Sequence, residues 1–418
     1  MIDIPDEKHM ILNAIRAKHN VCITGAAGTG KSFLLQMVKE HFSHVHVTAS
    51  TGVAAVNIGG VTIHSWAGIG KASFPPEEIA KFINSGPGTK IRRQIKRAKL
   101  LAIDEISMIS AQVFNLLNQV FQLVRENEQP FGGIQIVVLG DFFQLPPVSH
   151  DNHIDFCFSS DAWDEAEFKI FELAEVFRQS DLRFIQLLNN MRRAALNEED
   201  LDLLNGRQNL NIPEDHNPTI LVTHNYQAEK INIDKLRMLD AEEKYAFKMS
   251  EKGKDKAVAF LKKNCLAQEE LVLKLGAQVM MLKNTLQKQG IINGSIGTII
   301  GFSRKEHLPM VKFRNGEICV VTPEEWNVEV FNEMTQEKET TGSIKQLPLI
   351  LAWAITIHKS QGMTLDNVLC DLSNIFAEGQ AYVALSRVKS LDGLYLKGFK
   401  PSALRVNKQV LEFYNDID

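Results

Sequence analysis

Hydrophobic residues in the first half of the chain gather into short apolar runs, several of which end in small or polar residues. The runs are residues 21–23, 45–47, 100–103 and 134–139. The first two lead through a small polar turn into stretches with helical character, at residues 33–35 and 53–58. Repeated strand, turn and helix predict a parallel α/β sheet, and ligands of such sheets bind at the carboxyl ends of the strands.

The second half of the chain repeats this pattern around an alternating segment. Residues 220–223 predict a strand and residues 225–239 a helix. Residues 349–357 are again apolar, and residues 380–388 predict a further helix. Residues 310–321 alternate apolar and polar side chains around an Asn-Gly pair, which is typical of a β-hairpin. With its apolar flanks, this segment predicts a small SH3-like β-barrel inserted into a second α/β lobe.

Composition limits the class of protein without identifying a partner. A chain of 418 residues suggests two or three domains, and its net charge of −4 gives no global sign of nucleic-acid binding. Its five cysteines lie far apart without a C-x-x-C pair, which argues against zinc and iron–sulfur sites. The polar, acidic N-terminus and the short apolar runs predict a soluble cytoplasmic protein without a signal peptide or a membrane span.

The most basic stretch, residues 81–99, carries seven positive charges and no acidic residue. These charges could neutralise nucleic-acid phosphates, or they could form a solvated helix face, and the sequence favours neither explanation. Pro75-Pro76 and the Gly-Pro-Gly at residues 86–88 break up this region. We therefore predict an insertion on the core sheet.

The strongest chemical signal is the octapeptide GAAGTGKS, which lies between a predicted strand and a predicted helix and matches the phosphate-binding P-loop. The candidate nucleotide-binding residues are Gly25, Ala26, Ala27, Gly28, Thr29, Gly30, Lys31 and Ser32. The glycines let the backbone aim N–H groups at phosphate oxygens, and the helix adds the positive end of its dipole. We expect Lys31 to reach the β- and γ-phosphates of ATP and Ser32 to ligate the bridging Mg²⁺.

Two further strands end in candidate catalytic residues. The run at 100–103 leads directly into Asp104 and Glu105, the Walker B arrangement of P-loop proteins. We expect Asp104 to hold Mg²⁺ through water and Glu105 to orient or deprotonate the attacking water. After the run at 134–139, Gln144 supplies an amide that can sense the γ-phosphate or its water.

Nine sequence blocks together give the chain a resemblance to a known family. Their order is that of the superfamily-one helicase motifs, and GDFFQLPPV and ITIHKSQG are specific to Pif-type helicases, relatives of RecD and of the phage Dda enzyme. The blocks are GAAGTGKS, TASTGVAA, TIHSWAG, DEISM, GDFFQLPPV, LAEVFRQ, LKLGAQVMMLKN, ITIHKSQGMTLD and QAYVALSRV. They extend over nearly the whole chain.

The resemblance implies an α/β fold with two RecA-like P-loop lobes, a small wedge insertion in the first lobe and an SH3-like β-barrel insertion in the second. The expected boundaries are 1–67 and 100–175 for the first lobe, 68–99 for the wedge, 176–245 and 346–418 for the second lobe, and 246–345 for a connection plus the β domain. ATP would bind between the lobes, and single-stranded DNA would run across both.

The same resemblance implies an ATP-dependent helicase that moves 5′ to 3′ on single-stranded DNA. Expected substrates are duplexes, forks and other single-strand/double-strand junctions, RNA–DNA hybrids and G-quadruplexes, with roles in DNA repair, recombination and telomere maintenance. We expect a monomer associated with the nucleoid. The alternative is a DNA-stimulated ATPase that remodels nucleoprotein without processive unwinding. The intact Lys31, Asp104, Glu105 and Gln144 argue against a helicase-like module that has lost catalysis.

Further residue roles follow only from the resemblance. Arg178 and Arg387 would contact the γ-phosphate. The residues that would line the DNA path are Thr51, His64, Pro146, His358 and Ser360. Lys8 stands where the family usually has a glutamine that reads the adenine edge. Because a lysine donates hydrogen bonds but cannot accept them, preference for ATP over other nucleotides is an open question.

Overall fold

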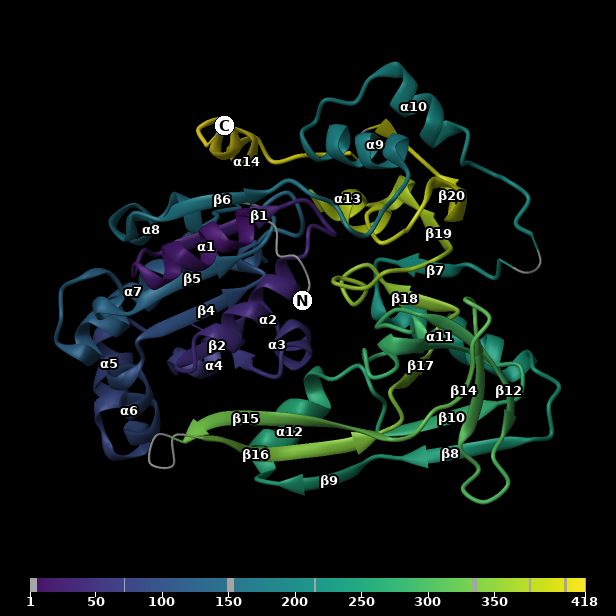
Figure 1. Cartoon of the computed structure of the whole chain (residues 1–418), viewed down its shortest axis with the longest axis horizontal. Coiled ribbons are helices and arrows are strands. Elements are labelled where there is room, and N and C mark those ends of the chain that lie inside the picture. The colour runs from purple at the N-terminus through teal and green to yellow at the C-terminus, as the bar shows by residue number, and fades with distance from the viewer. Residues whose placement is uncertain are drawn as a thin grey trace. The chain divides into compact units, whose positions relative to one another are not determined.

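The computed structural model describes residues 6–70, 72–148, 154–213, 216–332, 337–375, 377–401 and 404–417. The chain divides into two compact units, and each is described here by itself (Figure 1). Unit 1 comprises Met1–Phe177, Val330–Lys338 and Asn407–Asp418, and unit 2 comprises Arg178–Glu329 and Glu339–Val406. Among the described residues, every helix is too short or too polar to cross a membrane.

Unit 1 is built on a six-stranded sheet in which every neighbouring pair of strands is parallel. The strand order is β3-β2-β4-β5-β1-β6. The strands are β1 (Val21–Gly25), β2 (Val45–Ala49), β3 (Val61–Thr62), β4 (Leu100–Asp104), β5 (Gln135–Leu139) and β6 (Lys169–Leu173). β1 and β4 are buried along their whole length, which explains their continuous apolar sequences. The predicted parallel α/β sheet is confirmed.

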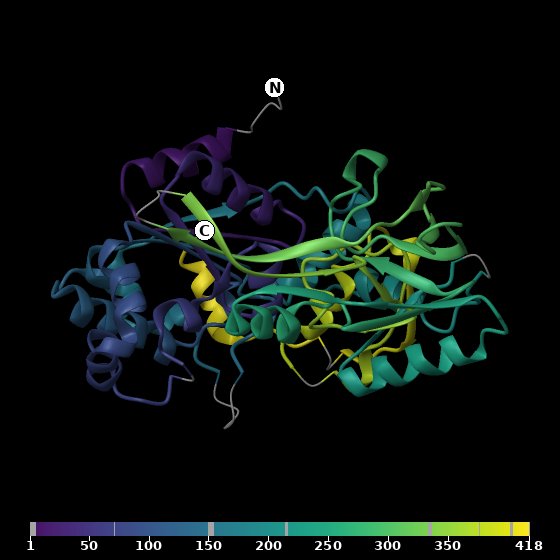
Figure 2. The same cartoon turned by 90° about the horizontal axis from the view of Figure 1, so that it is seen from below.

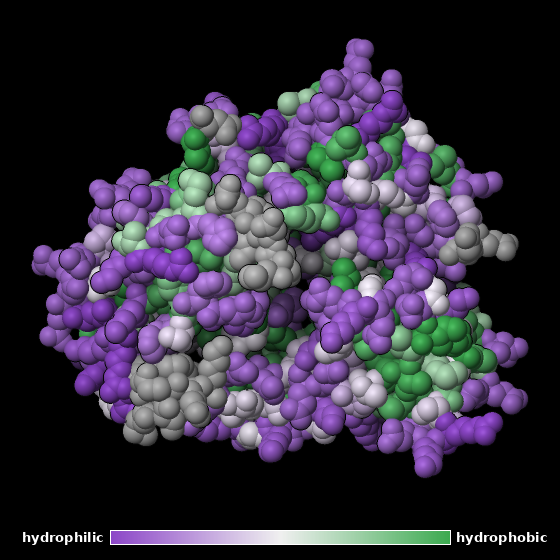
Figure 3. All heavy atoms as spheres, in the orientation of Figure 1, coloured by the Kyte–Doolittle hydropathy of each residue, from purple (hydrophilic) through white to green (hydrophobic). Residues whose placement is uncertain are grey.

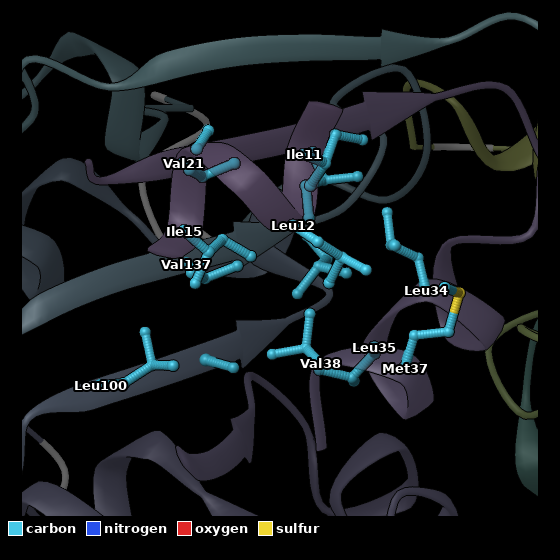
Figure 4. Close-up of a cluster of buried hydrophobic side chains, with 14 of the residues drawn as sticks. Ile11, Leu12, Ile15, Val21, Leu34, Leu35, Met37, Val38, Leu100 and Val137 are labelled. Atoms are coloured by element: carbon cyan, nitrogen blue, oxygen red, sulfur yellow. The ribbon is translucent and has the colours of Figure 1, made fainter. Parts of the chain in front are cut away.

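Unit 1 also contains helices, several of which pack on its sheet. They are α1 (Asp6–Arg16), α2 (Lys31–His41), α3 (Gly52–Asn57), α4 (Ile63–Ala67), α5 (Pro76–Asn84), α6 (Thr89–Arg97), α7 (Ala111–Arg125), α8 (Asp161–Ala166) and α14 (Lys408–Asn415). The apolar sides of α1 and α2 form one buried cluster with β1, β4 and β5. Figure 4 shows this cluster, in which Ile11 and Leu12 of α1 and Val38 of α2 lie near strand residues Val21 and Val137. This core fixes the ends of β1 and α2, between which the P-loop runs.

The basic stretch forms part of a small helical region. Helices α5 and α6 pack against each other and against α7. All seven basic side chains of residues 81–99 are exposed. Lys96 pairs with exposed Glu126 at 3.0 Å, which makes a screened surface contact. Exposure agrees with both explanations of this stretch, so its role and the boundaries of a wedge stay predictions.

The C-terminal helix lies in a different part of the molecule from the one expected, since the expected boundaries place residues 346–418 in the second lobe. Instead α14 belongs to unit 1. The Tyr414 hydroxyl forms a hydrogen bond with Thr24 of β1, and its ring stacks on Phe143 with centroids 4.5 Å apart. Phe413 stacks on Phe158 at 4.4 Å. These aromatic contacts join residues far apart in sequence, so no local pattern could reveal them.

Unit 2 contains a second parallel sheet, with strand order β18-β7-β19-β20. Its strands are β7 (Thr219–Val222), β18 (Ala354–Thr356), β19 (Val368–Asp371) and β20 (Leu394–Gly398). Its accompanying helices are α9 (Leu182–Arg192), α10 (Glu198–Asn205), α11 (Asn225–Met238) and α13 (Gln380–Leu385). The chain leaves this sheet after β7 and α11 and returns at β18, so the intervening residues are an insertion.

The insertion is rich in antiparallel strands. Its main sheet has the order β14-β13-β12-β11-β17 and encloses a separate apolar core. These strands are β11 (Gln278–Met281), β12 (Ile296–Phe302), β13 (Pro309–Phe313), β14 (Ile318–Val320) and β17 (Leu349–Leu351). The predicted hairpin is confirmed as β13 and β14, which turn at Gly316 with φ 91°.

Other elements of the insertion extend from this sheet. They are β8 (Lys244–Lys248), β9 (Ser250–Gly253), β10 (Glu270–Lys274), β15 (Glu324–Asn332), β16 (Glu337–Gln346) and α12 (Asp255–Asn264). β15, β16 and β9 form a long ribbon that is clear in the view from below (Figure 2). Ile300, Ile318 and Val320 are exposed, and Figure 3 shows an apolar area over β12 and β14.

Candidate functional site

The P-loop joins β1 to α2 at the carboxyl edge of the first sheet. Gly25, Gly28 and Gly30 have φ angles of 145°, 89° and 85°, which suit glycine and strain other residues. A Cβ on Gly25 would lie only 2.7 Å from the carbonyl oxygen of Leu173. The first turn of α2 contains no acidic side chain, so the positive end of the helix is not neutralised there. The loop therefore presents N–H groups suited to phosphate.

Side chains of the loop support this geometry. Lys31 lies across the loop, where its Nζ donates to the carbonyl oxygens of Gly25 at 2.7 Å and Ala26 at 2.9 Å. Thr29 is buried and its hydroxyl donates to Ala26, also at 2.9 Å, so it helps to fix the turn. Ser32 is exposed in the first turn of α2. The Lys31 ammonium thus lies at the start of the phosphate-binding turn, and the exposed Ser32 hydroxyl follows its end.

The Walker B pair lies at the same edge of the sheet, because β4 is separated from β1 only by β5. Burial raises the pKa of Asp104 to about 6, against the opposing effects of the Glu105 N–H and the Lys31 charge. That N–H donates to Oδ1 of Asp104 at 2.9 Å. Glu105 has φ 53°, a left-handed conformation that costs a non-glycine residue about 1 kcal/mol. Backbone strain of this kind clusters at functional sites.

The residues at this edge fit a magnesium ion that is shared with a nucleotide. Mg²⁺ usually keeps several waters and takes one or two protein carboxylates together with substrate phosphates. Asp104 offers a buried carboxylate whose charge is incompletely compensated, and Ser32 offers a hydroxyl. Within the described ranges, no cluster of three or more His, Cys, Asp or Glu side chains could hold a metal by itself. Bound there, Mg²⁺ would neutralise charge on the phosphates.

Gln144 is placed by a residue that the sequence analysis missed. Asp141 is fully buried directly after β5, and its Oδ2 accepts a hydrogen bond from Nε2 of Gln144 at 3.3 Å. Its Oδ1 accepts from the Phe143 N–H at 3.3 Å. Asp141 thus orients the Gln144 amide. The available signal was the same as for Asp104, a carboxylate that follows a buried apolar strand.

Unit 2 brings together Arg178 and Arg387, the two arginines that the family resemblance predicts to contact the γ-phosphate. Arg178 donates from Nη1 to the Ser386 carbonyl oxygen and from Nε to the Thr364 hydroxyl, both at 3.1 Å. Arg387 is 1% exposed, and its Nη2 donates to the Ser386 hydroxyl at 2.9 Å. Its Nε donates to the Val383 carbonyl oxygen at 2.9 Å. Both guanidinium groups therefore meet at Ser386, although they come from opposite ends of the unit.

The expected DNA-path residues fall into two groups. Thr51, His64 and Pro146 lie in unit 1, and His358 and Ser360 lie in unit 2. Among them, Thr51 accepts from the Ala54 N–H at 3.2 Å and so caps α3. Burial lowers the pKa of His64, which favours its neutral form.

The other three expected DNA-path residues, Pro146, His358 and Ser360, differ in how exposed their side chains are. Pro146 is half-buried and His358 is exposed. Ser360 is fully buried and donates its hydroxyl to the Ile357 carbonyl oxygen at 2.8 Å. The hydroxyls of Thr51 and Ser360 thus have structural partners, and contact of all five residues with DNA stays a prediction.

Two family models match the chain. Residues 4–202 match the PIF1-like helicase model, and residues 259–302 match the 2B domain of the DNA helicase Pif1. The chain is 38% identical to the ATP-dependent DNA helicase PIF1 of Xenopus laevis and 35% identical to Pif1 of Bdellovibrio bacteriovorus. Both alignments cover 100% of this chain, with 65% of the Xenopus protein and 93% of the Bdellovibrio protein. The chain therefore spans less than two thirds of the vertebrate relative.

Solved structures are similar over nearly the same length. The structure of Bacteroides sp Pif1 in complex with ADP-AlF4 has a TM-score of 0.88 and 32% identity to this chain. The structure of Bacteroides Pif1 bound to ssDNA has a TM-score of 0.66, again at 32% identity. Each match covers 100% of this chain and 97% of the other.

Proposed function

This chain belongs to the PIF1-like helicase family, and from that premise we propose that it is an ATP-dependent DNA helicase. One observation carries the proposal: a P-loop with Lys31 lies at the same sheet edge as the Asp104–Glu105 pair. This arrangement supplies phosphate binding, a metal ligand and a candidate base for the attacking water.

The residues of unit 1 divide the work of ATP hydrolysis. The loop N–H groups and the Lys31 ammonium hold the phosphates, with Ser32 and Asp104 as ligands of Mg²⁺. Glu105 takes a proton from the attacking water, and its strained backbone holds the carboxylate beyond the end of β4. Gln144, held by Asp141, orients that water or the γ-phosphate. Lys31 and Ser32 lie at the start of α2, Asp104 and Glu105 lie at the end of β4, and Gln144 lies in the turn after β5.

The two arginines of unit 2 supply the remaining charge in this proposal. An arginine at the γ-phosphate contributes about 10³ to 10⁵ in rate. Arg178 and Arg387 donate to backbone and hydroxyl oxygens around Ser386, and these hydrogen bonds orient both guanidinium groups. Arginines that bind the γ-phosphate of ATP and release it after hydrolysis would couple the nucleotide to movement along DNA.

We further propose 5′-to-3′ movement of a monomer on single-stranded DNA. The strand would pass Thr51, His64, Pro146, His358 and Ser360. Residues 68–99, which include the basic helix α6, would act as the wedge at a junction. Residues 246–345 would form the connection and the SH3-like domain. Duplexes, forks, RNA–DNA hybrids and G-quadruplexes are the proposed substrates. Because each base-pair step costs about 1.4 kcal/mol of stacking, unwinding one step needs little of the energy of one ATP.

The alternative is an ATPase that remodels nucleoprotein without processive unwinding. It uses the same nucleotide chemistry, so mutations at the P-loop cannot separate the two functions. A strand-displacement assay separates the two functions, because only the helicase opens a duplex.

The first test is ATP hydrolysis with and without single-stranded DNA, in the presence and absence of Mg²⁺. The proposal expects hydrolysis that needs Mg²⁺, that rises strongly with DNA and that is lost in Lys31→Ala. Hydrolysis that DNA leaves unchanged, or that survives Lys31→Ala, would contradict it.

A further inference from the structure

The Lys8 side chain is largely buried beside the P-loop. Lys8 is 5% exposed, and no hydrogen bond or ion pair joins it to any other residue in the described part of the chain. Its Nζ instead lies 5.1 Å from the centroid of the Phe33 ring and 4.7 Å from that of Phe177. Two aromatic faces stabilise a cation without accepting conventional hydrogen bonds from it. The N–H groups of Lys8 can therefore donate to a ligand atom that accepts hydrogen bonds.

This cation lies within reach of the nucleotide that the P-loop would hold. A Cβ built on Gly30 would be 3.9 Å from Nζ of Lys8 and 3.6 Å from the Phe177 ring. The Phe177 N–H donates to the Gly28 carbonyl oxygen at 2.9 Å, which ties this ring to the loop. Phe33 lies in the first turn of α2. Phe33 and Phe177 are 46% and 54% exposed, so both offer surface on which a planar group can stack.

We propose that Lys8, Phe33 and Phe177 bind the base of the nucleotide and that Lys8 favours guanine. The inference rests on the proposed function, because it concerns the base of the same nucleoside triphosphate. Guanine presents two acceptors, O6 and N7, on one edge, and a lysine can donate to both. Adenine presents N7 beside an amino group, which is itself a donor and gains nothing from an ammonium. The chain therefore uses GTP at least as efficiently as ATP.

The test compares guanine with adenine nucleotides for the wild type and Lys8→Gln. Displacement of a fluorescent nucleoside diphosphate by GDP or ADP gives the ratio of affinities, and DNA-stimulated hydrolysis of GTP and ATP gives the ratio of kcat/KM. A glutamine amide supplies one donor and one acceptor, which match N7 and the amino group of adenine. We expect Lys8→Gln to shift both ratios toward adenine by about 5- to 150-fold.

Two further variants separate base recognition from a structural role. Lys8→Ala should bring the ratios toward unity without the gain in adenine binding. Lys18→Gln, which changes an exposed lysine just beyond the end of α1, should leave the ratios unchanged. A loss of folding would lower all affinities together and would not move a ratio.

The outcomes distinguish this inference from the proposed function. A wild-type preference for adenine above about 10-fold that Lys8→Gln leaves unchanged would overturn the role of Lys8. If neither triphosphate is hydrolysed, the proposed function fails, while the displacement ratios still decide the role of Lys8. Equal or tighter binding of GDP, reversed by Lys8→Gln, supports it.

Discussion

The two parallel sheets of the molecule share one architecture but carry different chemistry at their carboxyl edges. In unit 1, β1 leads through a glycine-rich turn into α2, so backbone N–H groups surround a space suited to phosphate. In unit 2, β7 is separated from α11 only by Thr223 and His224. A connection of two residues without glycine is too short to direct several backbone N–H groups at one phosphate. The second sheet instead lies in the unit that holds Arg178 and Arg387.

The difference shows how one architecture supplies two roles. A phosphate-binding loop needs positive φ angles, so glycine spacing determines where it can occur. A guanidinium group needs only acceptors that fix its plane, and Ser386 supplies one to Arg178 and one to Arg387. In the proposed function, the first sheet binds the nucleotide and the second unit contributes positive charge.

The largest expected effect is the loss of hydrolysis in Lys31→Ala. This change removes the ammonium at the P-loop, and we expect DNA-stimulated ATP hydrolysis to fall below detection. The control is Lys230→Ala, an exposed lysine of α11, the helix that follows β7 in unit 2. Steady-state phosphate release measures both. If Lys230→Ala lost as much hydrolysis as Lys31→Ala, the two sheets would not differ in their contribution to phosphate binding.

Arg178→Ala tests the contribution of unit 2. We expect kcat for ATP hydrolysis to fall about 10³-fold, the lower end of the range for an arginine at a γ-phosphate, with nucleotide affinity nearly unchanged. The control is Arg207→Ala, which loses donors to the Leu394 and Asp392 carbonyl oxygens in the same unit. A similar fall in kcat for Arg207→Ala would show that the loss is structural.

Asp104→Asn should stabilise the protein when nucleotide and Mg²⁺ are absent. Burial raises the pKa of Asp104 to about 6, so the folded state binds this proton more tightly than the unfolded state. Protonated Asp104 therefore contributes to the free energy of unfolding at acid pH, and this contribution is lost as the pH rises from about 4 through 6. Because Asn stays neutral, we expect a gain of roughly 3 kcal/mol at pH 8 that disappears near pH 4.

Thermal unfolding at both pH values measures this gain. The control is Asp371→Asn at the end of β19, where Oδ1 accepts from the Ser373 N–H at 2.9 Å and from its hydroxyl at 2.7 Å. That variant should show no gain at either pH. If Asp104→Asn gained the same stability at pH 8 and at pH 4, the gain would not come from removing a buried negative charge.

The smallest effect concerns strain at Glu105. Since Glu105 has φ 53°, Glu105→Gly should raise the free energy of unfolding by about 1 kcal/mol. The control is Glu167→Gly, where φ is 47° at the C-terminal end of α8. Both variants should be more stable, but only Glu105→Gly should lose hydrolysis. Retained hydrolysis in Glu105→Gly would remove this carboxylate from the mechanism.

The sequence predicted features that depend on neighbouring residues. The P-loop, the Asp104–Glu105 pair and Gln144 each follow a buried apolar run, so their place at a strand end could be inferred locally. The 310–321 hairpin could be inferred because its turn needs Asn-Gly. The structure adds Asp141 as the residue that positions Gln144, from the same local signal.

Other features depend on contacts that no local pattern contains. The pairing of Tyr414 with Thr24 joins residues at opposite ends of the sequence, and it lies within unit 1, whereas the sequence boundaries place residues 346–418 in the second lobe. The meeting of Arg178 and Arg387 at Ser386 could be expected only from the family resemblance. The position of Lys8 between two rings could not be predicted either, because Phe177 follows β6, the last strand of the first sheet, and is far from Lys8 in the sequence.

The most direct test of the central claim is strand displacement with ATP on two duplexes that differ only in the polarity of a single-stranded tail. We predict displacement of the 5′-tailed duplex by the wild type, none of the 3′-tailed duplex, and none of either by Lys31→Ala. Displacement of the 3′-tailed duplex alone would contradict the proposed polarity. Hydrolysis without displacement of either duplex would contradict the helicase and leave the remodelling ATPase.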